Sequence, residues 1–160
     1  MKAHLRLDTA LRLIATNEKG HETVFDTAIA GGGLGSAAGP METVLEAAAA
    51  CTTMDVLPIL RKQRLIILDF WIDLTAERAH EHPKVFTKIV MDVHLTSPDA
   101  TIKDLARAIE LSHSKYCSVS VMLARSGCEI SWKATLENPE NQSKEYISSK
   151  VASKVVENLD

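Results

Sequence analysis

Cysteine is the residue type in this chain that could most readily do chemistry, and it occurs three times, as Cys51, Cys117 and Cys128. The count is odd and no C-x-x-C pair occurs, so the pattern fits neither a secreted disulfide framework nor a zinc site. Structural burial is the default interpretation for each cysteine. In a reducing compartment a thiol can also act as a nucleophile or redox centre, provided that the fold lowers its pKa and leaves it accessible.

Two of these thiols could work as a redox pair. A cysteine peroxidase needs one thiolate that attacks the O–O bond of a peroxide, and a second thiol that condenses with the resulting sulfenic acid to form a disulfide. Cys51 is expected within a helix and Cys117 at a junction between two helical pieces, so only tertiary structure could bring them together. Cys128 shares a face with Ile130 in an expected strand, which favours a place in the core.

Two further patterns suggest ligands but have simpler interpretations. Residues 33–38 fit the degenerate dinucleotide fingerprint G-x-G-x-x-A, but a true fingerprint needs a parallel β-α-β unit and an acidic residue at a strand end about 20 positions on. Here that position falls inside the next helix, so we interpret the stretch as a flexible connector. His80 and His82 flank Glu81 without a visible third ligand nearby, which favours a solvated loop over a metal site.

A helix over residues 41–64 is expected to carry Cys51. Pro40 suits the first turn of a helix, and apolar residues then recur at three- and four-residue steps, so that Cys51 belongs to the apolar face. The alanines at 47–50 keep the helix surface thin and leave little bulk to cover the thiol. Pro58 removes a backbone hydrogen bond, which predicts a kink just beyond the cysteine.

The remaining pattern predicts an α+β fold with antiparallel sheets. Short strands are expected before residue 26, and residues 68–74 and 85–95 alternate with period two around a polar connection, which is typical of a hairpin. Helical patterns follow over 97–117 and 118–124, and then a strand over 128–134. Four apolar residues at four-residue steps predict an amphipathic helix at the C-terminus: Ile147, Val151, Val155 and Leu159.

Composition excludes several classes of function. The chain has 160 residues, of which 46% are hydrophobic and 24% are charged, as expected for one ordinary globular domain. The formal net charge is −3 and the lysines are scattered, so we expect no nucleic-acid partner. No apolar run approaches the roughly 18 to 20 residues of a membrane span, and the N-terminus lacks a signal-peptide pattern. We therefore expect a cytoplasmic protein without a membrane partner.

Several motifs together resemble the OsmC family, which includes the organic hydroperoxide resistance proteins. They are Pro40-Met41-Glu42, the alanine run, Cys51 with Asp55-Val56 and Ile59-Leu60, the hairpin from Glu77-Arg78 to Ile89, and Lys115-Tyr116-Cys117-Ser118-Val119. The resemblance covers residues 1–136, which we expect to be the OsmC-like domain, with the appended helix at 137–160. It implies an intertwined homodimer with antiparallel sheets around central helices, and active sites between subunits.

The resemblance also implies roles for residues. Cys51 matches the peroxidatic cysteine and Cys117 the resolving one, with no cofactor and no metal. Family peroxidases add an N-terminal arginine and a glutamate ten residues before the reactive cysteine, but Met41 stands there, and the adjacent Glu42 is the candidate, as in a more distant subgroup. Arg6 and Arg12 are the N-terminal arginine candidates, and both are expected to be strand-surface charges. Two further expectations come from spacing: Asp55, one turn after Cys51, should raise the pKa of the thiol, and His113 should lie on the surface.

Three functions follow, from different classes. The first is thiol-dependent reduction of a small organic hydroperoxide by Cys51 and Cys117, with an external dithiol as reductant. The second is a binding or sensing protein that keeps an apolar pocket between subunits but turns over poorly, which the displaced glutamate and absent arginine favour. The third, a cysteine hydrolase built on Cys51 and a histidine, lacks a supporting motif.

Overall fold

The structure, a computed structural model, describes residues 1–151 and the side chains up to residue 148. The chain forms two units, residues 1–46 and the part from Ala47 onward, and each is described by itself. The long helix α1 (Pro40–Lys62) begins in the first unit and continues in the second.

The first unit is a three-stranded antiparallel sheet of β1 (Ala3–Thr9), β2 (Arg12–Asn17) and β3 (Glu22–Phe25). Within residues 1–46, Ile14 is the single buried apolar side chain, and every residue of β1 is exposed. With so little apolar surface buried, the sheet gains little stability from its own packing.

The glycine-rich stretch after β3 is an ordered loop, which corrects the expectation of a flexible connector. It contains the short helix η1 (Ile29–Gly31), and the buried Asp26 carboxylate accepts hydrogen bonds from the backbone N–H groups of Thr27, Leu34 and Ser36. These bonds hold the pKa of Asp26 well below its ordinary value. A Cβ on Gly33 would lie 2.1 Å from the Thr27 carbonyl oxygen, so glycine is required where the chain folds back on itself.

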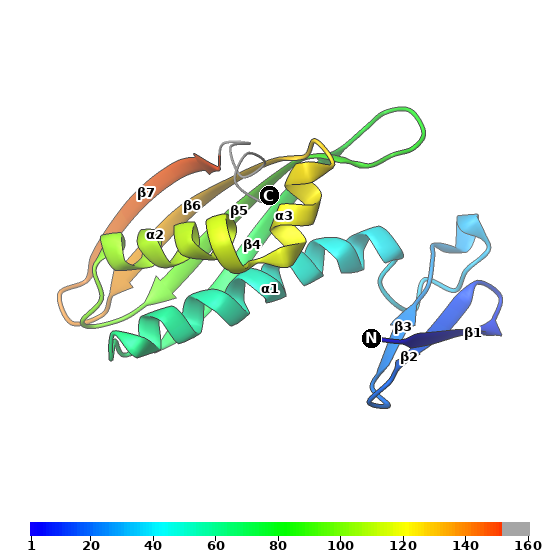
Figure 1. Cartoon of the computed structure of the whole chain (residues 1–160), viewed down its shortest axis with the longest axis horizontal. Coiled ribbons are helices and arrows are strands. Elements are labelled where there is room, and N and C mark those ends of the chain that lie inside the picture. Colours follow the sequence, from blue (N-terminus) through cyan, green and yellow to red (C-terminus); the bar gives the residue numbers. More distant parts are fainter. Residues whose placement is uncertain (152–160) are drawn as a thin grey trace. The chain divides into compact units, whose positions relative to one another are not determined.

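The second unit is built on a four-stranded sheet in the order β4-β5-β6-β7 (Figure 1). Its strands are β4 (Asp69–Arg78), β5 (Phe86–Thr96), β6 (Glu129–Asn138) and β7 (Ser143–Val151). The hairpin of β4 and β5 confirms the predicted alternation, but β5 and β6 are parallel, so the sheet is mixed rather than wholly antiparallel. A parallel pair needs a crossover, and the helices α2 (Ile102–Leu111) and α3 (Ser118–Arg125) provide it.

The core of the second unit lies between one face of this sheet and the helices. Alternate residues of β5 and β6 point into it, including Ile89, Met91, Ile130 and Trp132. From α1, a buried stripe at four-residue steps packs here: Ala48, Thr52, Val56 and Leu60. The helices α2 and α3 cover the same face of the sheet (Figure 1). The α+β class expected from the sequence is confirmed.

The expected C-terminal helix is wrong for the part that the structure describes. Residues Ser143–Val151 form the strand β7, which pairs antiparallel with β6 from Asn138↔Ser143 to Ile130↔Val151. Residues 152–160, which include Val155 and Leu159, lie outside the described residues. The boundary at residue 136 falls inside β6, so that strand continues past the end of the expected domain.

Helix α1 is long and apolar enough to cross a membrane by length and composition alone. Its 23 residues include an 18-residue window of mean hydropathy 1.4, and 22% of that window is buried. Length and composition alone do not assign a membrane span, because the central helix of a globular protein has the same properties. The exposed apolar side chains of α1 would be more stable against another apolar surface.

Candidate functional site

Cys51 lies on α1 beside the buried stripe of that helix. Thr52 is fully buried and fixes this turn of the helix against the core, while Cys51 itself is half-buried. Asp55 follows one helical turn later and is also half-buried, so its carboxylate lies on the same face as the thiol. The helix thus presents a thiol and a carboxylate side by side at the margin of the core.

Cys117 occupies the N-cap position of α3 and is fully buried. Its sulfur accepts a hydrogen bond from the backbone N–H of Ser120 at 3.5 Å, and the Ser120 hydroxyl lies 3.1 Å from it. The Thr52 hydroxyl donates to Met91 Sδ at 3.8 Å, and its oxygen lies 3.7 Å from the Cys117 sulfur. Cys117 is therefore held by α3 on one side and by α1 on the other.

The two cysteines and the carboxylate converge on one point. The sulfurs of Cys51 and Cys117 and a carboxylate oxygen of Asp55 all lie within 4.8 Å of one another, and all three residues belong to the second unit. Both thiols are free. A disulfide bond is about 2.05 Å long, so the sulfurs must approach each other further before they can bond. Tertiary structure brings together the pair that the sequence placed on separate elements.

The surroundings of Cys51 work against its thiolate. Burial raises the pKa of this thiol above its ordinary value, the neighbouring Cys117 and Asp55 raise it further, and the backbone N–H of Val119 lowers it. The expected effect of Asp55 is confirmed, although burial is the larger cause. None of these groups carries a positive charge, so at neutral pH Cys51 is mainly a thiol in the isolated chain.

Asp55 is itself held in place by Ser112. The Ser112 hydroxyl donates to Asp55 Oδ2 at 2.9 Å, and Ser112 is fully buried at the start of the π-helical segment η2 (Ser112–Tyr116). Sequence reasoning missed Ser112 and Thr52, because nothing in their spacing links them to the cysteines. It could have found Ser120, since a hydroxyl three residues after Cys117 has the spacing of a helix-capping pair.

The other residues that the sequence proposed lie in the first unit, where each has a local partner. Glu42 Oε2 accepts the Gly39 N–H at 2.6 Å and so caps the start of α1. Arg12 pairs with Asp8, and Arg6 lies 3.8 Å from the same carboxylate. Arg6 is exposed, as expected, and Arg12 is half-buried. A catalytic role for Glu42 stays a prediction.

His113 contradicts its expected place on the surface. It is buried in η2, and neither ring nitrogen has a hydrogen-bond partner among the described residues. Burial lowers the pKa of His113 to about 4, so the ring is neutral at physiological pH. The π-helical turn shifts the side-chain register relative to a continuous α-helix, and a 3.6-residue projection therefore misplaces this residue. Cys128, by contrast, is buried as expected.

Two places in the described part of the chain carry side chains of the kind that bind metal ions. His80 and His82 are exposed in the connection between β4 and β5. Cys51, Asp55 and Cys117 are a donor set of the type that holds Zn²⁺, since two thiolates and a carboxylate can supply three of four ligands. The expectation of a metal-free site therefore stays a prediction.

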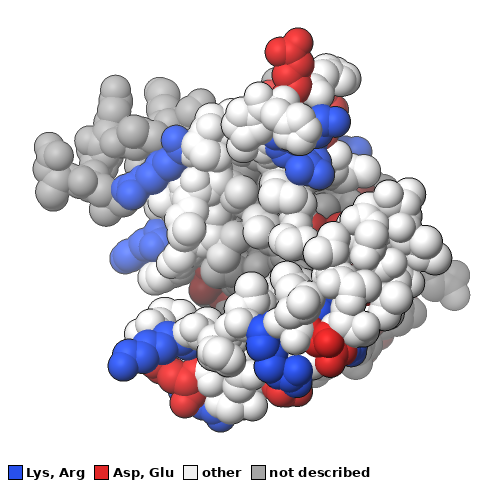
Figure 2. Space-filling model, turned by 90° about the vertical axis from the view of Figure 1, so that its right-hand side faces the viewer, with Lys and Arg blue, Asp and Glu red and all other residues white. Residues whose placement is uncertain are grey.

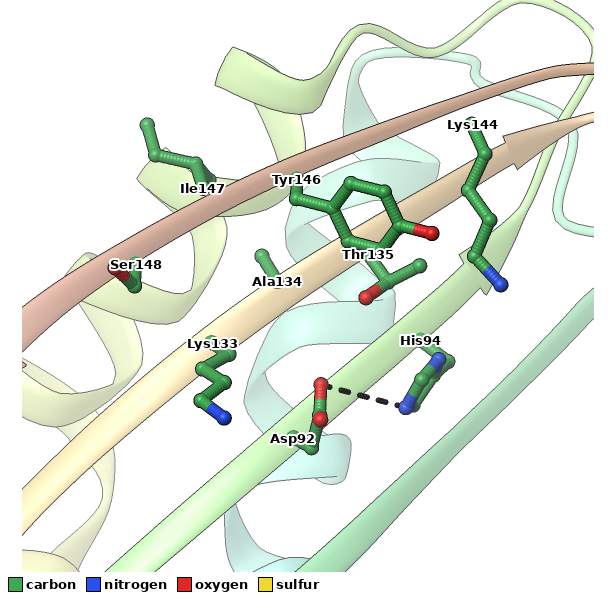
Figure 3. Close-up of a pocket in the computed structure, with 9 residues that line it drawn as sticks. All are labelled: Asp92, His94, Lys133, Ala134, Thr135, Lys144, Tyr146, Ile147 and Ser148. Carbon is green, nitrogen blue, oxygen red and sulfur yellow. Dashed lines mark ion pairs between the residues drawn. The ribbon is translucent and has the colours of Figure 1, made fainter.

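A separate cavity of about 500 Å³ lies on the outer face of the sheet of the second unit (Figure 3). His94 is fixed there: its ring stacks on Trp71 with centroids 4.5 Å apart, and its Nε2 lies 3.3 Å from Asp92 and 3.6 Å from Asp73. Tyr146 and Lys144 of β7 border the other side. No cysteine lines this cavity, so it is distinct from the thiol site.

Charged side chains of both signs are interspersed on the face of the molecule shown in Figure 2. They do not gather there into a basic stripe of the kind that follows a nucleic-acid backbone. Among the thiol site, the exposed histidines and the cavity on the sheet, the thiol site is the arrangement with the clearest chemistry.

Comparison with known proteins identifies the family of the chain. The sequence model of the family described as OsmC-like protein matches residues 33–133. Protein YhfA of Escherichia coli (strain K12) is 37% identical over 125 residues, which cover 78% of this chain and 90% of YhfA. The crystal structure of a hypothetical protein from Aquifex aeolicus VF5 superposes with a TM-score of 0.71 at 29% identity, and covers 85% of this chain and 96% of that one.

The fold is also that of a protein named for peroxide resistance. The crystal structure of an organic hydroperoxide resistance protein OsmC from Legionella pneumophila has a TM-score of 0.59 and covers 85% of this chain and 96% of its own. At 14% identity this likeness concerns the fold alone. The family match extends over both cysteine motifs of the site, and with 37% identity to YhfA it shows that the chain belongs to the OsmC-like family.

Proposed function

We propose that this protein reduces small organic hydroperoxides through Cys51 and Cys117. The observation that carries the proposal is the convergence of the two sulfurs within 4.8 Å, one half-buried and the other fully buried. The more accessible sulfur is the one that a substrate can reach, which favours Cys51 as the attacking thiol and Cys117 as the resolving thiol.

The chemistry proceeds in three steps. The Cys51 thiolate attacks one oxygen of the hydroperoxide, the O–O bond breaks, and the alkoxide leaves and takes a proton to become an alcohol. Cys51 is then a sulfenic acid, and Cys117 condenses with it to give a disulfide and one molecule of water. An external dithiol reduces that disulfide and is itself oxidised, which returns both cysteines to thiols.

Thiolate formation is the step that needs most support. The N–H of Val119 is the stabilising contact within the chain, and it acts against burial, Cys117 and Asp55. We include Glu42 as a supporting carboxylate that a second copy of the chain would supply, because nine residues of one helix place Glu42 on the side of α1 opposite Cys51 in its own copy. Because its carboxylate already caps α1, Glu42→Gln is the suitable variant: an amide oxygen keeps the cap and removes the charge. We expect this variant to fold normally and to turn over more slowly.

The test compares three cysteine variants. Cumene hydroperoxide is consumed by the wild type in the presence of dithiothreitol, and Cys51→Ser abolishes this consumption. Cys117→Ser allows a single turnover and leaves a sulfenic acid at Cys51, which dimedone traps. Cys128→Ser is the matched control, because Cys128 is buried and not part of the pair. Consumption by Cys51→Ser at the wild-type rate would exclude the proposal.

We also propose that the working form is a homodimer in the cytoplasm. The nearly uncovered first unit and the exposed apolar side chains of α1 both require a covering surface, and a second copy of the chain can supply it. Cytoplasmic dithiols would provide the reductant, since that compartment keeps thiols reduced.

A second candidate function is a binding or sensing protein with slow turnover. The raised pKa of Cys51 favours it, because a thiol that stays protonated is a poor nucleophile. The rate of Cys51 alkylation by iodoacetamide against pH separates the two functions. A thiol pKa at or above about 8.5, the ordinary value, would favour binding, and a lower pKa would favour peroxidase chemistry.

A further inference from the structure

We propose that Cys51, Cys117 and Asp55 bind one Zn²⁺ ion when both thiols are reduced. The site adds a ligand to the thiol pair, and it exists whether or not the pair reduces hydroperoxides. It departs from the expectation of a metal-free site, which came from the sequence. The ion acts as a regulator in this scheme, since it occupies the sulfur that a hydroperoxide would have to reach.

The three ligand atoms lie close to the spacing that zinc requires. In a tetrahedral site with Zn–S distances of about 2.3 Å and a Zn–O distance of about 2.1 Å, neighbouring ligand atoms are roughly 3.6 to 3.8 Å apart. Both sulfurs and one oxygen of Asp55 lie within 4.8 Å of one another, so they need to approach by at most about 1.2 Å. A disulfide of about 2.05 Å requires a much closer approach of the same sulfurs. Zinc binding is therefore the smaller change from the reduced structure.

One of the three ligands is fixed and two have room to adjust. Cys117 is fully buried, and its sulfur accepts the backbone N–H of Ser120 at 3.5 Å. A hydrogen bond of this kind stabilises the negative sulfur of a metal-bound thiolate. Cys51 and Asp55 are half-buried on the same face of α1, so an ion can reach them from solvent and their side chains can close on it.

Ser112 orients the carboxylate of this site. Its hydroxyl donates to Asp55 Oδ2 at 2.9 Å from a fully buried position. A carboxylate has about four acceptor positions, so this hydrogen bond leaves room for the ion. Ligating carboxylates commonly have such a partner, and loss of the partner weakens metal binding. Ser112 is a positioning residue, since it touches the carboxylate and not the ion.

The charge of the site also favours a cation. In the described part of the chain, no lysine, arginine or histidine forms an ion pair with Asp55. Two thiolates and a carboxylate carry three negative charges, which repel one another at this distance unless a cation lies between them. Zn²⁺ cancels two of these charges, and the protons of the two thiols pass to solvent as it binds.

The chemistry of the ligands selects the metal. Mg²⁺ and Ca²⁺ take oxygen ligands, so two sulfurs disfavour both of these ions. Zn²⁺ accepts thiolates and carboxylates together, and it often keeps a fourth position for water. Cys51 and Asp55 are half-buried, so solvent can supply that water.

Zinc and a hydroperoxide would compete for the same thiols, and this consequence rests on the proposed function. The hydroperoxide takes two electrons from the two zinc-bound thiolates and two protons from solvent, and it becomes an alcohol and one molecule of water. The sulfurs form a disulfide and Zn²⁺ is released, because thiolates rather than disulfide sulfurs are the ligands of the metal. Bound zinc should therefore slow the consumption of cumene hydroperoxide.

The test titrates reduced, EDTA-treated protein with Zn²⁺ in competition with the chromophoric chelator zincon. We expect one Zn²⁺ per chain for the wild type. Cys51→Ser and Asp55→Asn should each lower the affinity by more than about tenfold, and Ser112→Ala by about tenfold, the lower end of the range for loss of a group that holds a ligand. Cys128→Ser is the matched thiol control and should bind as the wild type does, with circular dichroism as the check on folding.

Two further measurements identify the sulfur ligands. Co²⁺ in place of Zn²⁺ should give thiolate-to-metal charge-transfer absorption, which Cys51→Ser weakens and Cys117→Ser weakens as well. In the wild type, Zn²⁺ should slow the alkylation of Cys51 by iodoacetamide by at least about tenfold, because a metal-bound sulfur is not free to attack. Mg²⁺ is the control ion and should give no protection. The alkylation measurement needs no variant, so it holds even if Cys117→Ser does not fold.

The variants also separate this site from surface binding. Unchanged zinc affinity in Cys51→Ser, or loss of zinc binding when His80 and His82 are both replaced by alanine, would mean an adventitious ion only and would overturn the proposal. Alkylation of wild-type Cys51 at the same rate with and without Zn²⁺ would overturn it too.

Failure of the zinc site and failure of the proposed function give different results. A protein that binds zinc through these residues but does not consume cumene hydroperoxide keeps the metal site and loses the peroxidase assignment. A protein that consumes the hydroperoxide but does not compete with zincon for Zn²⁺ keeps the peroxidase assignment and loses the metal site.

Discussion

At the scale of single residues, His113 shows how burial of a titratable side chain without a hydrogen-bond partner makes the free energy of unfolding depend on pH. Its pKa is lowered to about 4 from the ordinary 6.5 because the core disfavours the charged ring. Between these two pH values the unfolded chain binds a proton that the folded chain does not. The free energy of unfolding consequently falls as the pH drops from about 6.5 to about 4, and the contribution is fully present above 6.5.

Replacement of His113 should make the protein more resistant to acid. The wild type is expected to lose about 3 kcal/mol from this residue between pH 7 and pH 4, since each pKa unit corresponds to about 1.4 kcal/mol. His113→Phe removes this loss and two unpaired polar atoms together. Urea unfolding at both pH values measures the effect, with the exposed His80→Phe as control. Parallel losses in wild type and variant would show that His113 does not remain neutral.

Sequence reasoning reached some residues of the site and not others, for physical reasons. Asp55 was predictable as a neighbour of Cys51 because one helical turn fixes their separation. Ser112 was not, since its contact with Asp55 joins residues 57 positions apart and depends on how α1 packs against the end of α2. The meeting of Cys51 and Cys117 came from the family resemblance, because no local spacing could establish it.

At the scale of elements, α2 begins at Ile102, five residues after the start expected from the sequence, and a capping box marks its N-terminus. The N-cap Thr101 accepts the Asp104 N–H at 3.3 Å, and Asp104 Oδ2 accepts the Thr101 N–H at 2.9 Å, which completes a capping box. Thr101→Ala should lower the free energy of unfolding by about 1 kcal/mol, since the Asp104 N–H loses its side-chain acceptor and Asp104 Oδ2 loses the Thr101 hydroxyl. Chemical denaturation measures this, and Thr101→Ser, which keeps the hydroxyl, should stay close to the wild type. Equal losses in both variants would contradict the capping role.

The strand β7 shows where an element pattern is ambiguous. Ile147 and Val151 are four residues apart, and this spacing suits a helix, where it is about one turn, and equally a strand, where it is two full alternations. The segment forms a strand because it pairs with β6, and this pairing cannot be inferred from the sequence of the segment alone. The hairpin of β4 and β5 was predictable because its alternation is long enough to exclude a helix.

At the scale of the whole molecule, the exposed apolar surface is the feature that a single chain does not explain. Leu5 and Leu7 of β1 are more than half exposed, and Met54 of α1 is 74% exposed. Exposed apolar patches are typical of interaction surfaces, and the proposed homodimer would cover these side chains. Composition could predict that the chain folds, but not that its core would be incomplete.

A homodimer predicts a defined response to a charge on α1. The wild type should sediment at micromolar concentration with twice the 17.5 kDa mass of the chain. Met54→Glu places a carboxylate on the exposed apolar face of α1 and should shift the equilibrium toward monomer, because a buried unpaired charge is costly. Lys103→Glu, on the exposed face of α2, is the control and should stay dimeric. A monomeric wild type, or one that binds phosphatidylcholine vesicles through α1, would contradict the dimer and assign that apolar face to a different environment.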